Sequence, residues 1–183
     1  MTYVALLRGI NVGGNNKIDM KKLKLSFESL GYTRVLTYIN SGNIIFEDAS
    51  KGKNALAAEI EEVIKRDFLL DIRVLVKSLE DIRLVCKQLP DDWVKDEVMR
   101  TDVMFLWDAF DYPEVLQKIK INPIDNVKYA PGAVLWKVDY KDYGQSGLSK
   151  LSGTEVFRNM TVRNVNTLRK LLQLMEISAL TAL

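Results

Sequence analysis

The sequence predicts an α+β fold, because short apolar strands alternate with amphipathic helices along its 183 residues. The run at 2–8 is almost wholly apolar, as expected for a strand that is covered on both faces or central in its sheet. Two more strands, at 33–39 and 43–47, are separated by Asn40-Ser41-Gly42-Asn43, whose residue types tolerate positive φ in a tight hairpin.

Two helices with a period of 3.6 residues accompany these strands. Asp19 is a suitable N-cap for the first helix, and Gly31 supplies its left-handed C-terminal stop. The second helix covers 53–68 and has one apolar face, and a strand at 72–77 follows it. The order is therefore β-α-β-β-α-β, the split βαβ arrangement of ferredoxin-like domains, and we assign residues 1–77 to this unit.

The remainder of the chain predicts a second α+β unit at 78–176 and a C-terminal tail at 177–183. No linker rich in Pro, Gly or Ser separates the units, so we expect them to pack tightly or to share a sheet. The expected elements are a capped helix from Ser78 to Leu89, strands at 101–106 and 133–139, a helix near 113–120, a helix from Ser146 toward Phe157, and a final helix capped by Thr161.

The composition excludes several chemistries. The chain has no histidine, which removes Ser-His-Asp and Cys-His nucleophiles and any zinc site that uses histidine. Its single cysteine cannot form an internal disulfide or a cysteine-only metal site. We therefore expect no metal and no cofactor. The sequence shows no recognisable catalytic constellation, and the question of an enzyme stays open.

The N-terminus does not have the pattern of a signal peptide, because Arg8 interrupts the apolar run at 4–7. No apolar stretch approaches the roughly 18 residues that a membrane span requires. We expect a cytoplasmic protein with no membrane partner, and Cys86 agrees with a reducing compartment. The sequence gives no indication of the oligomeric state.

Three segments carry a resemblance to a known family. They are Leu6-Leu7-Arg8-Gly9-Ile10-Asn11-Val12-Gly13-Gly14, Thr37-Tyr38-Ile39-Asn40-Ser41-Gly42-Asn43 and Thr161-Val162-Arg163-Asn164-Val165-Asn166-Thr167. The chain resembles the bacterial family of domain of unknown function 1697 over nearly its whole length. The family usually has Trp where this chain has Val165. The resemblance implies a cytosolic bacterial α+β protein with a ferredoxin-like portion, and no assigned reaction.

The predicted topology brings two of these motifs together. With the usual strand order 4-1-3-2, the end of the first strand and the turn between the second and third strands lie at the same edge of the sheet. The Gly-rich loop after Arg8 starts at this edge and leads into a helix N-terminus, which favours an anion. We therefore expect a small phosphate or carboxylate ligand at Arg8, Asn11, Gly13, Gly14, Asn15, Lys17, Asn40, Ser41, Gly42 and Asn43, approached by Arg163.

The closing motif allows two interpretations. Arg163, Asn164 and Asn166 could belong to a basic surface for phosphate or nucleic acid, or Asn164 and Asn166 could tie the first turn of a helix to the fold. The charges favour a positive edge if the chain ends meet, since residues 1–46 carry +4, 47–126 carry −6 and 127–183 carry +4.

Two alternatives to a small-anion site therefore stand. The first is binding of a nucleic-acid backbone through the basic terminal regions, although the aromatic residues with which an RRM stacks bases are missing. The second is a scaffold or interaction module, in which the Asn-rich motifs are internal hydrogen-bonding struts.

Overall fold

The computed structural model describes residues 1–181, which form two compact units. Unit 1 contains Met1–Ile82 and the chain from Leu171 onward, and unit 2 contains Arg83–Lys170. Each unit has its own four-stranded sheet, so the two units do not share one. The boundaries between the units fall inside two helices, α3 (Leu79–Gln88) and α5 (Val165–Leu180).

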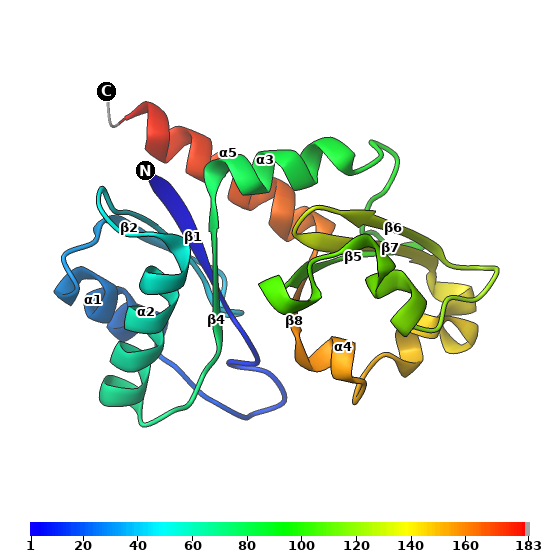
Figure 1. The fold of residues 1–183 in the computed structure, drawn as a ribbon, viewed down its shortest axis with the longest axis horizontal. Coiled ribbons are helices and arrows are strands. Elements are labelled where there is room, and N and C mark those ends of the chain that lie inside the picture. The colour runs from blue at the N-terminus through cyan, green and yellow to red at the C-terminus, as the bar shows by residue number, and fades with distance from the viewer. Residues whose placement is uncertain (182–183) are drawn as a thin grey trace. The chain divides into compact units, whose positions relative to one another are not determined.

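Unit 1 has the predicted order β-α-β-β-α-β (Figure 1). Its elements are β1 (Thr2–Leu7), α1 (Met20–Ser29), β2 (Thr33–Tyr38), β3 (Asn43–Glu47), α2 (Lys53–Phe68) and β4 (Val74–Ser78). The sheet order is β2-β3-β1-β4, with antiparallel pairing between all neighbours. This is the 4-1-3-2 arrangement of ferredoxin-like units, and the predicted α+β fold is confirmed.

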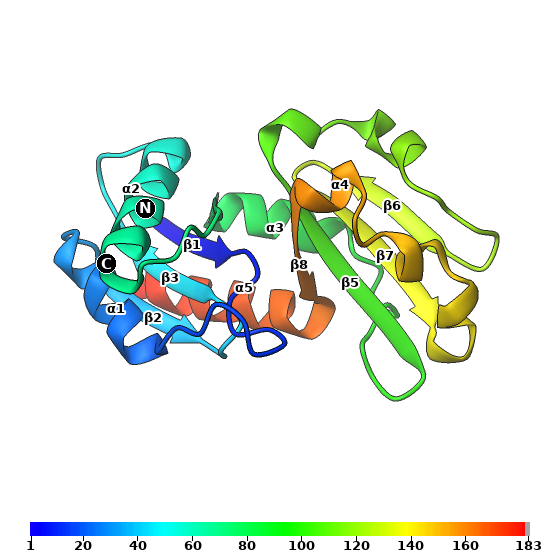
Figure 2. The ribbon, with the colours of Figure 1, turned by 90° about the horizontal axis from the view of Figure 1, so that it is seen from below.

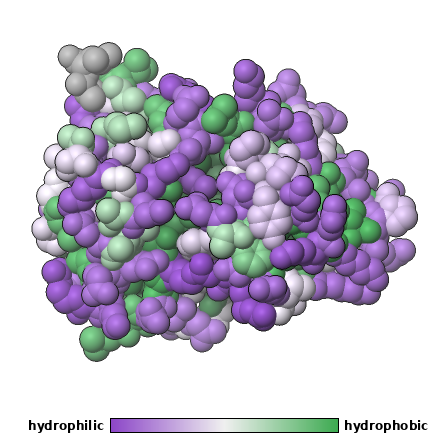
Figure 3. Space-filling view, viewed as in Figure 1, coloured by the Kyte–Doolittle hydropathy of each residue, from purple (hydrophilic) through white to green (hydrophobic). Residues whose placement is uncertain are grey.

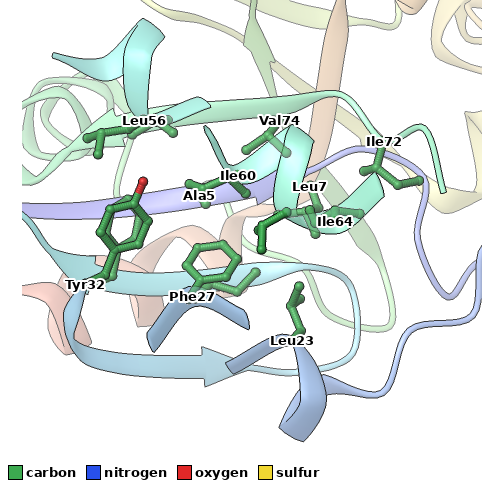
Figure 4. Close-up of a cluster of buried hydrophobic side chains, with 14 of the residues drawn as sticks. Ala5, Leu7, Leu23, Phe27, Tyr32, Leu56, Ile60, Ile64, Ile72 and Val74 are labelled. Carbon is green, nitrogen blue, oxygen red and sulfur yellow. The ribbon is translucent and has the colours of Figure 1, made fainter. Parts of the chain in front are cut away.

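The core of unit 1 lies between the sheet and the helices α1 and α2 (Figure 4). Leu23 and Phe27 of α1 and Ile60 of α2 are fully buried in it. Tyr32 stacks on Phe46 with ring centroids 4.6 Å apart. Aromatic rings stabilise such a core beyond the area that they bury.

Both faces of β1 are covered. On the helix-facing side, Tyr3 and its cross-strand neighbour Phe46 are buried in the core. On the other side, Val4, Leu6 and Ile45 are also fully buried. Neither face therefore presents an aromatic side chain on which an RNA base could stack.

Unit 2 is built on β5 (Met99–Leu106), β6 (Asn126–Ala130), β7 (Ala133–Asp139) and β8 (Met160–Asn164). Figure 2 shows these strands side by side, in the order β6-β7-β5-β8. Besides its parts of α3 and α5, the unit contains the short helix α4 (Glu155–Arg158) and 3₁₀ helices at Asp108–Phe110, Pro113–Lys118, Tyr140–Gln145 and Gly147–Lys150.

The structure corrects several predictions for this half. Thr161 does not cap a helix, because it lies in β8 opposite Phe105 of β5. The helix begins at Val165, and Asn164 accepts a hydrogen bond from the Thr167 amide, 2.9 Å away. Residues 177–180, expected as part of a tail, continue this helix.

The helix predicted from Ser78 is present as α3, but two other predicted helices of this half are shorter than expected. The helix near 113–120 is a 3₁₀ helix at Pro113–Lys118. Ser146 caps only the 3₁₀ helix at Gly147–Lys150, and the chain then turns through Gly153 at φ 87° before α4. The strand β6 was not predicted; it forms a hairpin with β7.

The surface seen in Figure 3 is mostly hydrophilic, with apolar side chains scattered between polar ones. Leu69 and Leu180 are among the exposed apolar residues, at 88% and 71% exposure. Isolated apolar side chains of this kind are normal on a protein surface.

Asp125 organises the loops of unit 2. Its carboxylate accepts hydrogen bonds from the amides of Asn122 and Gly147 at 2.8 and 3.0 Å, from Trp136 Nε1 at 3.1 Å, and from the Ser146 hydroxyl. Trp136 is fully buried. Burial raises the pKa of Asp125, but the hydrogen bonds lower it by more, so that its pKa lies below the usual value.

Replacing Asp125 should strongly destabilise the protein. We expect Asp125→Ala to lower the free energy of unfolding by about 3 kcal/mol or more, because several donors lose their acceptor away from water. Urea unfolding followed by circular dichroism measures this. The contribution of a carboxylate with a lowered pKa is complete above the unfolded pKa of about 4 and is lost at lower pH. The difference between the wild type and the variant should therefore shrink as the pH falls below about 4.

The matched control is Asp142→Ala, because the Asp142 side chain makes no hydrogen bond within residues 1–181. It should change the stability by less than about 0.5 kcal/mol. An equal loss in both variants would contradict the role of Asp125.

Candidate functional site

The Gly-rich loop and the hairpin turn of unit 1 are in direct contact. Asn11 Nδ2 donates to the backbone oxygen of Asn40, 2.9 Å away. The Leu7 amide, at the end of β1, donates to the Gly42 oxygen over 2.8 Å. The two motifs are therefore neighbours at one edge of the sheet, as the strand order requires.

Most of the asparagine side chains at this edge bind the protein's own backbone. Asn11 also donates to the Ile18 oxygen at 3.1 Å and accepts from the Ile18 amide at 2.9 Å. Asn16 Nδ2 donates to the Gly9 oxygen at 3.0 Å. Asn43 is fully buried and donates to the Tyr38 oxygen and to Ser41 Oγ at 3.1 and 3.0 Å. These amides hold the loop and the turn in place.

Gly42 is required at its position for two reasons. Its φ of 78° lies in the left-handed region, and a Cβ there would lie 2.7 Å from Leu7 Cβ. Gly13 and Gly14 also have positive φ, but they lie at the exposed tip of the loop beside Asn15. The tip is a tight turn closed by the Asn15 amide, which donates to the Val12 oxygen over 3.0 Å.

The N-terminus of α1 is capped by a carboxylate of the protein itself. The carboxylate of Asp19 accepts from the amides of Lys21 and Lys22 at 2.8 and 3.0 Å. These hydrogen bonds, that of Lys22 first, lower the pKa of Asp19. The first amides of α1 therefore donate to the protein's own carboxylate, and binding of an external anion at this helix end stays a prediction.

Two hollows border the loop. The first, here called the lysine hollow, has a volume of about 710 Å³ and is lined by Asn11, Gly14, Lys17, Ile18, Asp19, Met20, Lys21 and Asn40. The second, here called the arginine hollow, has a volume of about 320 Å³ and is lined by Arg8, Gly9, Asn16, Asp71, Ile72 and Arg73.

Arg73 is a residue that the sequence prediction missed. It precedes β4, whose first residue Val74 pairs with Leu7, so Arg73 lies beside Arg8. The Arg8 amide donates to the Arg73 oxygen over 3.0 Å. Burial lowers the pKa of Arg8, and the positive charge of Arg73 lowers it further. The predicted strand order already implied that the start of the fourth strand borders the end of the first.

The three predicted site residues of the closing motif lie in unit 2. Arg163 is buried in β8, where burial lowers its pKa to about 10, and it donates to Thr161 Oγ1 and to the Val162 oxygen at 3.0 and 2.8 Å. Asn164 caps α5, and Asn166 Nδ2 donates to the Lys95 oxygen at 2.9 Å. A role for these residues in anion binding stays a prediction.

Residues 1–181 contain no helix with the length and apolar character that a membrane crossing needs. In the same part of the chain, no three cysteine or acidic side chains are grouped so that they could hold a metal ion.

The fold and the loop define an α+β protein with a ferredoxin-like unit and a polar, Gly-rich sheet edge. The chain belongs to the family described as protein of unknown function (DUF1697), whose model matches residues 1–136. The closing motif lies beyond the matched residues. Among solved structures, the chain is similar to the conserved bacterial protein SP0830 from Streptococcus pneumoniae. The identity is 27%, the TM-score is 0.81, and the match covers 95% of this chain and 98% of that chain. No curated protein matches.

The tie made by Asn11 can be tested by removing its side chain. We expect Asn11→Gly to lower the free energy of unfolding by about 2–3 kcal/mol, because the Ile18 amide and two backbone oxygens lose their partner. Glycine is the suitable replacement, since the φ of Asn11 is 53°. The matched control Asn15→Gly should cost only about 0.5–1 kcal/mol, from chain entropy. Equal losses in urea unfolding would show that the hydrogen bonds of Asn11 add nothing.

Ile39, beside Asn40, adopts a strained backbone. Its φ is 50°, a conformation that β-branched residues avoid, and its side chain is 49% exposed. We expect Ile39→Asn to raise the free energy of unfolding by about 0.5–1 kcal/mol, because asparagine adopts this region at lower cost. Ile39→Val keeps the strain and should not stabilise the protein. The strain would be refuted if urea unfolding showed the Asn variant to be no more stable than the wild type.

Proposed function

We propose that unit 1 binds a small anion, a phosphate or a carboxylate, in the arginine hollow. The observation that carries this proposal is the pair of guanidinium groups, Arg8 and Arg73, that line one hollow at the start of the Gly-rich loop. Two like charges close together repel each other, and here the repulsion contributes to the lowered pKa of Arg8. An anion bound between the two guanidinium groups would attract both of them and so offset their mutual repulsion.

The chemistry of the hollow suits an oxyanion. Guanidinium groups bind carboxylates and phosphates with two parallel hydrogen bonds, which gives both affinity and orientation. Asp71 also lines the hollow, so its three charged side chains sum to one positive charge. Gly9, with φ 70°, brings bare backbone to the wall of the hollow. We expect the protein to act in the cytoplasm, as the sequence predicts.

The internal hydrogen bonds of the asparagines are compatible with an anion site in the arginine hollow. The internal hydrogen bonds of Asn11, Asn16 and Asn43 support the interpretation of these residues as a scaffold. The same bonds fix the loop before a ligand arrives, which reduces the entropy lost on binding. The role that we propose for the asparagines is therefore to position the loop, while the arginines contact the anion.

Thermal unfolding with sodium phosphate and with sodium chloride at equal ionic strength tests the proposal. For a dissociation constant of about 1 mM, about 10 mM phosphate would stabilise the protein by about 1.4 kcal/mol. This corresponds to a rise in Tm of about 3–5 °C for a protein of this size. Arg8→Gln and Arg73→Gln should each abolish the rise that phosphate causes.

The matched control is Arg66→Gln, which removes an exposed arginine that lines neither hollow. This variant should keep the full rise in Tm. Comparing each variant with and without phosphate separates binding from any change in intrinsic stability. If phosphate raises the Tm of the wild type no more than chloride does, the arginine hollow is not an anion site.

A further inference from the structure

The lysine hollow has no role in the function proposed above. We propose that it receives a second anionic group of the same ligand, which is then a small molecule with an anionic group at each end. This inference rests on the proposed function and deepens it, because it names the class of ligand. Its basis is the charge of the lysine hollow and its position relative to the arginine hollow.

The lysine hollow is lined by two cationic side chains, Lys17 and Lys21. Neither Lys17 nor Lys21 forms an ion pair with any acidic side chain in residues 1–181. The nearby carboxylate of Asp19 accepts from two backbone amides of α1. Counting Lys17, Lys21 and Asp19, the hollow carries one net positive charge, as the arginine hollow does.

The position of Lys21 does not serve the stability of its helix. It lies in the first turn of α1, where the helix dipole disfavours a cation. Lys22 is the next residue, and the first turn holds no acidic residue. Positive charge is thus concentrated beside the lysine hollow against the preference of the helix, and an anionic ligand would balance it.

The two hollows are lined by residues that pair with each other across the loop. Asn11 lines the lysine hollow and Asn16 lines the arginine hollow, and the Asn11 amide donates to the Asn16 oxygen over 3.1 Å. The bridge between Val12 and Asn15 continues this pairing, so the loop is a short two-stranded ribbon. Paired strands lie about 5 Å apart, so a short linker can join anionic groups on the two sides.

A small molecule fits this arrangement better than a nucleic acid. A polynucleotide is bound by a row of cations along its backbone and by aromatic side chains that stack its bases. Here the cations that line the two hollows are two arginines in one and two lysines in the other. Tyr3 and Phe46, the aromatic residues of the central strands β1 and β3, are buried in the core.

Isothermal titration at constant ionic strength tests the inference with inorganic phosphate and with a series of α,ω-alkanediol bisphosphates. Once one phosphate is bound, the second binds at an effective concentration set by the linker. We expect the best linker to bind at least about tenfold more tightly than phosphate, with weaker binding by shorter and longer ones. The double variant Lys17→Gln/Lys21→Gln should bring the bisphosphate affinity down to that of phosphate and leave phosphate binding unchanged.

The matched control is Lys22→Gln/Lys24→Gln, which also removes two positive charges but alters no residue that lines either hollow. It should keep the bisphosphate preference. If phosphate binds but every bisphosphate binds equally weakly, this inference is overturned and the proposed function stands. If neither binds, both are overturned. Tight binding of a single-stranded oligonucleotide with a steep loss of affinity in salt, and none of bisphosphates, would overturn the inference in favour of nucleic acid.

Discussion

The polar edge of unit 1 depends on the hydrogen bonds that the Asn11 carboxamide makes. This carboxamide binds both the amide and the oxygen of Ile18, and it also binds the oxygen of Asn40. One side chain thus closes the Gly-rich loop and joins it to the turn between β2 and β3. Without this side chain, the loop would lose its hydrogen bond to the Asn40 oxygen of the turn and the two bonds that hold it to Ile18.

The sequence was sufficient to predict the fold of unit 1, because its local signals agree with one another. The apolar run of β1, the N-cap Asp19 and the turn at Gly42 each specify one conformation, and together they specify the observed strand order. That order in turn placed the loop against the turn. The charged residues of this edge were harder to predict from the sequence. Arg73 belongs to no recognisable motif, and it reaches the edge only because β4 pairs with β1.

Unit 2 was harder to predict because long-range pairing outweighs local preference there. Thr161 is a good helix cap in isolation, yet it pairs with Phe105, and the capping role passes to Asn164. The strand β6 had a readable signal, the alternation of Val127 and Tyr129 before a Pro-Gly turn, but its polar residues obscured it. The helix expected from Ser146 is cut short at Gly153.

The absence of histidine has a consequence for how this edge would respond to pH. No side chain on either hollow is an imidazole, the group whose charge ordinarily changes between about pH 5 and 8. A phosphate monoester does change charge in that range, because its second ionisation has a pKa of about 6. If the anion proposed above is a phosphate monoester, the ionisation of the ligand itself would make binding depend on pH in this range.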